Sequence, residues 1–182
     1  WDYPVPVRVS EILTEFNVPT AGNIVDLGCG TGMSGEALRA KGFTGSMTGM
    51  DISQASLDLV KSSKPSVYNH LHIGNLDLPL TQLTAPPYDA FIAVGVFSYV
   101  ERFDVLFSQI VEFLSPGGLL VFSHHVAYWD DDRRGCRTAA EALEAEGKWS
   151  LVRAGDPEPY MPSNPDPNES KKRIRLVVFR KS

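Results

Sequence analysis

A glycine-rich loop directly after a short apolar run constrains this chain more than any other feature. The stretch reads VDLGCGTGMSG and covers residues 25–35. Gly28, Gly30 and Gly32 alternate with other residues, which is more glycine than a tight turn between a strand and a helix requires. Glycines let the backbone adopt positive φ and approach a ligand closely, and the N-terminus of a following helix favours an anionic group. The stretch therefore predicts a strand, a ligand-binding loop and a helix.

Strand and helix patterns alternate along most of the chain. Apolar or alternating runs predict strands at residues 23–27, 45–51, 66–74, 88–98, 119–123, 149–154 and 173–181. Apolar residues at helical spacing, or residues of high helix propensity, predict helices at 5–17, 31–41, 54–62, 103–114 and 137–147. Such alternation predicts an α/β fold with a mostly parallel, seven-stranded sheet and helices on both faces. Because no helix separates the last two strands, we expect the last strand to be antiparallel.

The composition fits one domain over residues 1–182, with a core at 23–182 that the helix at 5–17 caps. Hydrophobic residues make up 43% of the chain, charged residues 21%, and the net charge is −5. An acidic balance disfavours a broad basic face for nucleic acid, although a local basic spot is compatible with it. No apolar run reaches the roughly 20 residues that span a bilayer.

The two cysteines, Cys29 and Cys136, lie in unrelated segments and predict no disulfide framework. We therefore expect a cytoplasmic protein, a monomer or weak homodimer that binds neither nucleic acid nor membrane. The first residue is Trp1 and not methionine, so the sequence leaves open that a leader was removed.

Two kinds of cofactor compete for the glycine loop. The letters GTGMSG, residues 30–35, match the dinucleotide fingerprint G-x-G-x-x-G. Counted from Gly28, the first glycine after the strand, the third fingerprint position is Met33, so the match begins two residues late. Asp26 lies just before the loop, where a carboxylate would repel a pyrophosphate but suit a cationic amino group. The residues favour a cationic ligand and leave an NAD(P)-dependent oxidoreductase as the alternative.

The stretch VDLGCGTG resembles the first motif of class I S-adenosylmethionine (SAM)-dependent methyltransferases. The resemblance implies that the loop holds the methionyl part of SAM and that Asp26 contacts its ammonium, directly or through water. The second motif of the family is an acid that ends strand two and binds both ribose hydroxyls. Asp51, in GMDIS, matches it.

Later motifs extend the resemblance to residues 24–123 in the family's order. IGNLDLPL is similar to the third motif, with Asn75 where the family usually has Asp, and YDAFIAVGVFSYVE is similar to the fourth. LSPGGLLVFS matches the turn before strand five. The resemblance implies a Rossmann-like class I methyltransferase fold, with SAM as cofactor and S-adenosylhomocysteine as product. The residues that it places at the cofactor are Asp26, Gly28, Cys29, Gly30, Gly32, Asp51, Ile52, Asn75, Leu76, Gly95 and Val96.

The two ends of the chain resemble a narrower group. DYPVPVRVSEIL near the start and AAEALEAEGKWSLV with YMP near the end are similar to the Williams–Beuren-region methyltransferase-like proteins. Family members usually carry residues before the first helix that cover the cofactor. Either Trp1 and Tyr3 are the remnant of that lid, or the lid lies in a part of the gene product that this sequence does not include.

The acceptor would bind beyond the carboxyl ends of strands four to six. Methyl transfer needs an aligned acceptor, and a base only where the acceptor is protonated. His124, His125 and Tyr99 are the catalytic candidates, and for each histidine a structural role is at least as good an interpretation. If strand six is parallel, the proline-rich loop 155–171 borders the acceptor pocket. The expected substrate-binding residues are Phe97, Tyr128, Tyr160 and Met161.

The acids Asp130, Asp131 and Asp132 precede two arginines and are interpreted as a solvated turn, so no metal is expected. The sequence thus predicts SAM-dependent methyl transfer to a small-molecule acceptor. An inactive SAM-binding partner or regulatory module stays open because of Asn75 and the short N-terminal segment. The NAD(P)-dependent oxidoreductase is the weaker alternative.

Overall fold

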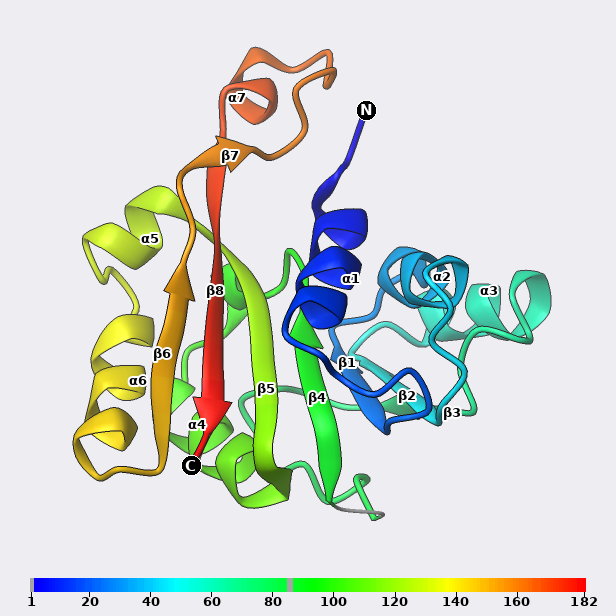
Figure 1. Ribbon diagram of the computed structural model, residues 1–182. Coiled ribbons are helices and arrows are strands. Elements are labelled where there is room, and N and C mark those ends of the chain that lie inside the picture. Colours follow the sequence, from blue (N-terminus) through cyan, green and yellow to red (C-terminus); the bar gives the residue numbers. More distant parts are fainter. Residues whose placement is uncertain (1, 85–86) are drawn as a thin grey trace.

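The computed structural model describes residues 2–84 and 87–182. Within these residues the strands form one eight-stranded sheet of order β3-β2-β1-β4-β5-β8-β6, with β7 attached to β8 (Figure 1). The strands are β1 (Ile24–Leu27), β2 (Met47–Asp51), β3 (His70–Ile73), β4 (Tyr88–Ala93), β5 (Leu114–His125), β6 (Trp149–Ala154), β7 (Glu158–Pro159) and β8 (Arg173–Lys181).

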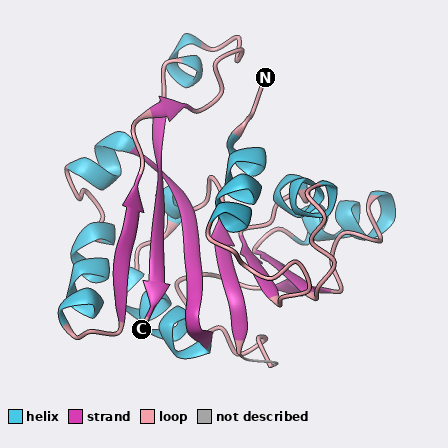
Figure 2. Ribbon diagram, in the orientation of Figure 1, coloured by secondary structure: helices cyan, strands magenta, loops and turns pink. Residues whose placement is uncertain are grey.

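Helices cover both faces of this layer (Figure 2). They are α1 (Val5–Glu15), α2 (Met33–Ala40), α3 (Gln54–Ser63), the 3-10 turn η1 (Phe97–Tyr99), α4 (Phe103–Phe113), α5 (Val126–Asp130), α6 (Cys136–Ala145) and α7 (Pro167–Ser170). In the described part of the chain, none of them is long and apolar enough to cross a bilayer.

The direction of the strands agrees with the predicted fold class. β1 to β5 pair in parallel, and β8 is antiparallel to both of its long neighbours, β5 and β6. β6 therefore runs parallel to the first five strands, as the position proposed for the proline-rich loop requires. The sequence analysis missed the two-residue β7, which pairs with the start of β8.

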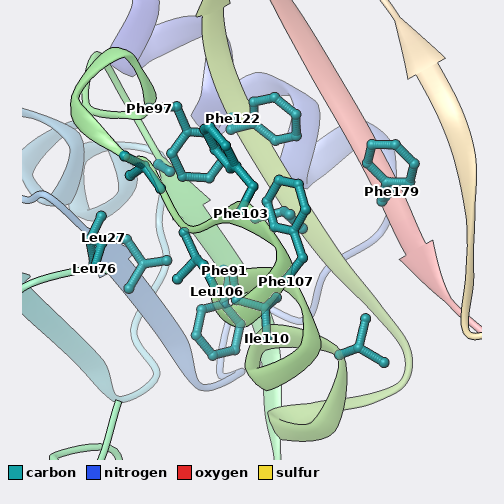
Figure 3. Close-up of a cluster of buried hydrophobic side chains, with 14 of the residues drawn as sticks. Leu27, Leu76, Phe91, Phe97, Phe103, Leu106, Phe107, Ile110, Phe122 and Phe179 are labelled. Carbon is teal, nitrogen blue, oxygen red and sulfur yellow. The ribbon is translucent and has the colours of Figure 1, made fainter. Parts of the chain in front are cut away.

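Alternating side chains along the central strands divide the core in two. Phe91 and Phe122 point to the face that α4, α5 and α6 cover, and Ile92 and Val121 point to the face covered by α1, α2 and α3. Figure 3 shows the first of these cores, in which aromatic rings from η1, α4, β5 and β8 pack together. Trp149 closes it, with its indole N–H donating to the carbonyl of Ala140 at 2.9 Å.

Several predicted boundaries were wrong for local reasons. The strand expected at 66–74 is only β3, because Tyr68 turns inward and the side chain of Asn69 accepts hydrogen bonds from Met47 and Arg39. β5 begins at Leu114, before the break predicted at 115–118, because the chain stays beside β4 while its register shifts. The strand expected at 88–98 ends at Ala93, where the chain turns into η1.

Candidate functional site

The loops that follow β1 to β5 meet at one edge of the sheet, the upper end in Figure 1. Four adjoining cavities lie along this edge and share wall residues. Their volumes are about 100, 210, 470 and 690 Å³, in order along the edge. Gly28 lines the cavities of 100 and 210 Å³, and Gly95 and Tyr160 line those of 210 and 470 Å³. His125 lines the cavities of 470 and 690 Å³. Parallel sheets bind ligands beyond their carboxyl ends, so this edge is the candidate site.

Backbone hydrogen bonds anchor the glycine loop to β2. The N–H groups of Gly28 and Cys29 both donate to the carbonyl of Met50, at 2.8 and 3.0 Å. Gly28 has φ +68°, and a Cβ there would lie 2.5 Å from a methyl of Val96, so any other residue would clash. Gly30 has φ +50°, and a Cβ there would meet nothing within 4 Å. The space beside Gly30 is therefore open to a ligand.

Asp51 ends β2 and braces this loop. Its Oδ2 accepts the N–H of Gly30 at 2.7 Å, and its Oδ1 accepts the N–H of Ser53 at 2.8 Å. Each carboxylate oxygen has a second lone pair. The side chain also lines the cavity of about 100 Å³ that Gly28 shares. Asp51 can thus accept two further hydrogen bonds from neighbouring hydroxyls, which is what the sequence analysis expected of it.

Asp26 lies inside β1 and is fully buried. Its Oδ2 accepts a hydrogen bond of 2.6 Å from the hydroxyl of Tyr68, and its Oδ1 has no partner within the described residues. Burial raises the pKa of Asp26 to about 7, and the charge of Asp51 adds to this, while the bond from Tyr68 acts in the opposite direction. A buried acceptor without a donor is costly, so Oδ1 calls for a cationic or water donor.

The sequence analysis missed Tyr68, which precedes β3. It also gave Gly35 no purpose beyond its place on α2. The N–H of Gly35 donates to the Tyr68 hydroxyl at 3.2 Å, and a Cβ at Gly35 would lie 2.6 Å from that oxygen. The glycine therefore makes room for the tyrosine. Neither residue carries a signal that links them, because 33 positions separate them in the chain.

The 100 Å³ cavity also contains the residues that the third motif predicted. Leu76 and Ile52 form apolar walls, and Asn75 stands beside them. The Asn75 side-chain oxygen accepts the N–H of Asp77 at 2.9 Å, which leaves it one lone pair. The cavity thus combines apolar walls with an amide that can still accept a hydrogen bond, a combination that suits a heteroaromatic ring.

Further along the edge, the proline-rich loop folds over the end of β4. Tyr160 and Met161 line a cavity of about 470 Å³ together with Gly95, Tyr99 and His125. Tyr3 packs edge-on against Tyr160, with ring centroids 5.2 Å apart. Tyr3 also lines the cavity of the glycine loop. The other suggested lid residue, Trp1, lies outside the described residues.

Two expected site residues lie elsewhere. Phe97 was expected to face the acceptor, but η1 turns its ring into the core, 4.7 Å from the ring of Phe122 and fully buried (Figure 3). His124 is also buried, against Phe97 and Phe103, and neither ring nitrogen has a hydrogen bond to any residue that the structure describes. β5 continues through His125, so its alternation sends the two histidines to opposite faces, and only His125 reaches the cavities.

The other candidates lie around a cavity of about 690 Å³, which Tyr99, His125 and Tyr128 line. Tyr99 is 79% exposed and forms a wall of three of the four cavities. Tyr128 stacks on His124 with centroids 5.6 Å apart and covers it. Burial lowers the pKa of His124 to about 4 and also lowers that of His125.

The acidic run is more structured than the predicted solvated turn. Asp130 accepts two hydrogen bonds from Arg175, at 2.8 and 3.0 Å, and Asp131 pairs with Arg133 at 2.9 Å. Asp132 accepts the backbone N–H groups of Arg137 and Thr138 at the start of α6. Each acid has its own partner, and the three do not converge.

The residues present fit the cofactor that the motifs imply. A buried carboxylate oxygen without a donor suits an ammonium, the open space at Gly30 admits a chain, and Asp51 suits a pair of ribose hydroxyls. Gly32 shapes the start of α2 with φ +86°, and Val96 lies against Gly28. Cys29 is buried beside the loop, and burial raises the pKa of its thiol, so it is not a reactive group.

Curated relatives are similar to this chain over part of their length. The chain is 27% identical over 140 residues to trans-aconitate 2-methyltransferase of Variovorax paradoxus, covering 77% of this chain and 51% of that one. It is 29% identical over 103 residues to malonyl-[acyl-carrier protein] O-methyltransferase 2 of Ilyobacter polytropus, covering 56% and 38%. The chain thus spans about half, or less, of the length of these relatives.

Comparison with solved structures shows the same fold in a known methyltransferase. An S-adenosylmethionine-dependent methyltransferase of Clostridium acetobutylicum superposes with a TM-score of 0.74 at 16% identity, over 100% of this chain and 93% of that one. Residues 25–120, more than half of the chain, match the family model described as a methyltransferase domain. The match begins at the strand before the glycine loop and ends in β5, so it includes every cofactor residue discussed above. The chain therefore belongs to the methyltransferase-domain family.

Proposed function

We propose that this chain transfers the methyl group of SAM directly to a small-molecule acceptor. The observation that carries the proposal is the arrangement of three groups at one edge of the sheet. They are the open loop at Gly30, the two-oxygen acceptor Asp51 and the buried, undonated Oδ1 of Asp26. A dinucleotide would bring a pyrophosphate to the same loop, where the carboxylate of Asp26 would oppose it.

The roles of the cofactor residues follow from their positions. Asp26 would hold the ammonium of SAM, Asp51 the ribose hydroxyls, and Leu76 with Ile52 the faces of the adenine ring. Asn75 would accept from the adenine amino group with its remaining lone pair. When bound, SAM supplies a methyl group already activated by its positive sulfur.

The chain's own contribution to transfer would be alignment and exclusion of water. Tyr160 and Tyr3 close over Gly95, where the cavity of the glycine loop joins the cavities beyond it. His125 and Tyr99 are the groups that can orient an acceptor there, and burial lowers the pKa of His125, which favours its neutral form. His124 faces the core, so we assign it a structural role.

The relatives support a small acceptor. Their names give trans-aconitate and malonyl-[acyl-carrier protein] as the molecules methylated. The cavities lined by His125 have volumes of about 470 and 690 Å³, which suit a small molecule. A SAM-binding module without activity is the second candidate, because the Asn75 oxygen already accepts from Asp77.

Calorimetry with SAM, S-adenosylhomocysteine and NAD tests the proposal. We expect both adenosyl compounds to bind and NAD not to bind. Asp51→Ala should abolish binding of the adenosyl compounds, whereas Asp58→Ala, an exposed site on α3, should leave it unchanged. Binding of NAD alone would refute the proposal. A screen of acceptors for S-adenosylhomocysteine production then separates an enzyme from an inactive module.

Other features stay predictions of the sequence. These are the cytoplasmic location, the monomeric or weakly dimeric state, the absence of a metal and of nucleic-acid binding, and the resemblance to the Williams–Beuren-region methyltransferase-like proteins. Residues 155–171 as the acceptor-side loop are proposed on the same footing, with Tyr160 and Met161 at the cavity as support.

A further inference from the structure

The 690 Å³ cavity between α5, η1 and the start of β8 carries an unusual charge. Four basic side chains line it, together with two acidic ones. The chain as a whole has a net charge of −5. Positive charge is therefore concentrated at this end of the sheet, where α5 and the first residues of β8 lie side by side (Figure 1). The basic residues are Arg134, Lys171, Lys172 and Arg173.

The two acids of the lining do not neutralise these cations. Asp130 forms its paired hydrogen bonds with Arg175, and Asp131 pairs with Arg133, and neither arginine lines the cavity. Asp130 and Asp131 thus each form an ion pair with an arginine that does not line the cavity. The lining cations keep their positive charge for other partners.

Three of the four lining cations lack a close carboxylate. Lys172 pairs with Glu169 at 2.6 Å. Arg134 approaches Glu101 only at 4.0 Å, and the Glu101 side chain is 77% exposed, so that pair is weak. Arg173 donates to the carbonyl of Pro157, and the side chain of Lys171 forms no hydrogen bond or ion pair within the described residues.

Apart from Ser98 and His125, the uncharged part of the cavity wall is apolar or aromatic. Val126, Ala127 and Tyr128 form one side, and Tyr99 forms the side toward the cofactor edge. Arg134 lies over the Tyr128 ring, 5.7 Å from its centroid, which keeps the guanidinium at the cavity. An apolar wall facing several unpaired cations suits a molecule with a hydrocarbon body and at least one anionic group.

We propose that this cavity binds a small organic anion, a carboxylate or phosphate ester, held by Lys171, Arg173 and Arg134. The inference rests on the proposed function only in taking that anion as the methyl acceptor. The cavity shares Ser98, Tyr99, His125 and Lys172 with the neighbouring cavity at Gly95. An anion bound here would therefore extend toward Gly95, where the neighbouring cavity meets the cavity of the glycine loop.

Titration of the full chain with three probes tests the inference by nuclear magnetic resonance. The probes are glutarate, glycerol 3-phosphate and the neutral analogue glutaramide. We expect at least one anion to bind at least about tenfold more tightly than glutaramide, and less tightly as salt is added. The order of the two anions tells a carboxylate from a phosphate ligand.

Paired variants locate the binding. Lys171→Gln with Arg173→Gln should remove about tenfold of the anion affinity. Lys41→Gln with Lys148→Gln removes two exposed charges from other parts of the surface and should change nothing. Since Arg173 also holds the Pro157 carbonyl, Lys171→Gln alone is the cleaner variant, with an expected loss of about threefold.

Calorimetry with S-adenosylhomocysteine separates this inference from the proposed function. Failure of every anion to bind, or equal binding by wild type and the Lys171/Arg173 pair, overturns the inference even where S-adenosylhomocysteine binds. Anion binding that the pair abolishes supports the site even where S-adenosylhomocysteine does not bind, in which case the proposed function fails alone.

Discussion

The hydroxyl of Tyr68 donates a 2.6 Å hydrogen bond to Oδ2 of Asp26, and Oδ1 has no donor among residues 2–84 and 87–182. The bond fixes the carboxyl group but does not compensate for its burial, so the pKa of Asp26 lies at about 7. Near neutral pH a proton therefore competes with a cationic ligand for the same group. Binding and stability should both depend on this competition.

The affinity for S-adenosylhomocysteine should rise with pH. Its ammonium favours the ionised form of Asp26, and that form grows from a minor to a major fraction as pH increases through about 7. We expect about tenfold tighter binding at about pH 8 than at about pH 6. Calorimetry across this range measures how the affinity changes with pH. The Asp26→Asn variant should bind S-adenosylhomocysteine weakly, with an affinity that does not change with pH. Affinity independent of pH in the wild type would contradict the assigned role.

Asp26→Asn should stabilise the ligand-free protein at alkaline pH. The folded pKa of about 7 lies above the ordinary 3.8, so folding takes up a proton between these values and the ionised group destabilises the fold above them. The gain should reach at most roughly 4 kcal/mol at about pH 8 and vanish toward about pH 4. Urea unfolding at both pH values measures it, with Asp58→Asn as the control. A loss of stability at every pH would refute this account.

Gly30→Ala should lose ligand binding while keeping the fold. A Cβ there meets nothing within 4 Å, so the methyl occupies the space proposed for the cofactor. We expect at least about tenfold weaker binding of S-adenosylhomocysteine and a cost of about 1 kcal/mol in stability from the positive φ. Gly117→Ala is a matched control, since Gly117 has φ +77° and equally open surroundings but lies at the far end of β5. If both variants bind S-adenosylhomocysteine equally well, the glycine loop is not the binding site of the cofactor.

His124→Leu should reduce the loss of unfolding free energy that the protein shows as the pH falls below neutral. Its folded pKa of about 4 lies below the ordinary 6.5, so wild-type stability falls as pH drops through this window, by up to about 3 kcal/mol. The leucine variant should lack that loss and still bind S-adenosylhomocysteine. Guanidinium unfolding from pH 7 downward compares it with His70→Leu, an exposed site on β3. An unchanged acid slope would mean that His124 is not the titrating group.

The sequence predicted what depends on local patterns. Strand and helix periodicity identified the fold class, and Asp26 with the loop glycines, and separately Asp51, were proposed from two short motifs. Contacts across the chain were not predictable in this way. Tyr68 reaches Asp26 from 42 residues away, and no spacing rule connects a loop tyrosine with a strand carboxylate.

The misplaced candidates share a physical cause. Phe97 and His124 lie at points where the exact end of a strand decides which face a side chain takes, since alternation reverses with each residue. β5 extends two residues beyond the strand expected at 119–123, so alternation sends His124 and His125 to opposite faces, and the turn η1 rotates Phe97 inward. Sequence patterns locate such ends least well.

The position of β8 has a consequence for how the protein forms during synthesis. Within the described residues, the long partner of β6 is β8, which follows β6 in the chain but lies between it and β5. A nascent chain that has reached Ala154 therefore exposes the free edge of β5 and an unpaired β6 until residues 173–181 emerge. Contacts of this kind close slowly and leave strand edges open to association. The side of the sheet formed by β5, β8 and β6 should thus be the last part whose strand edges become paired on the ribosome.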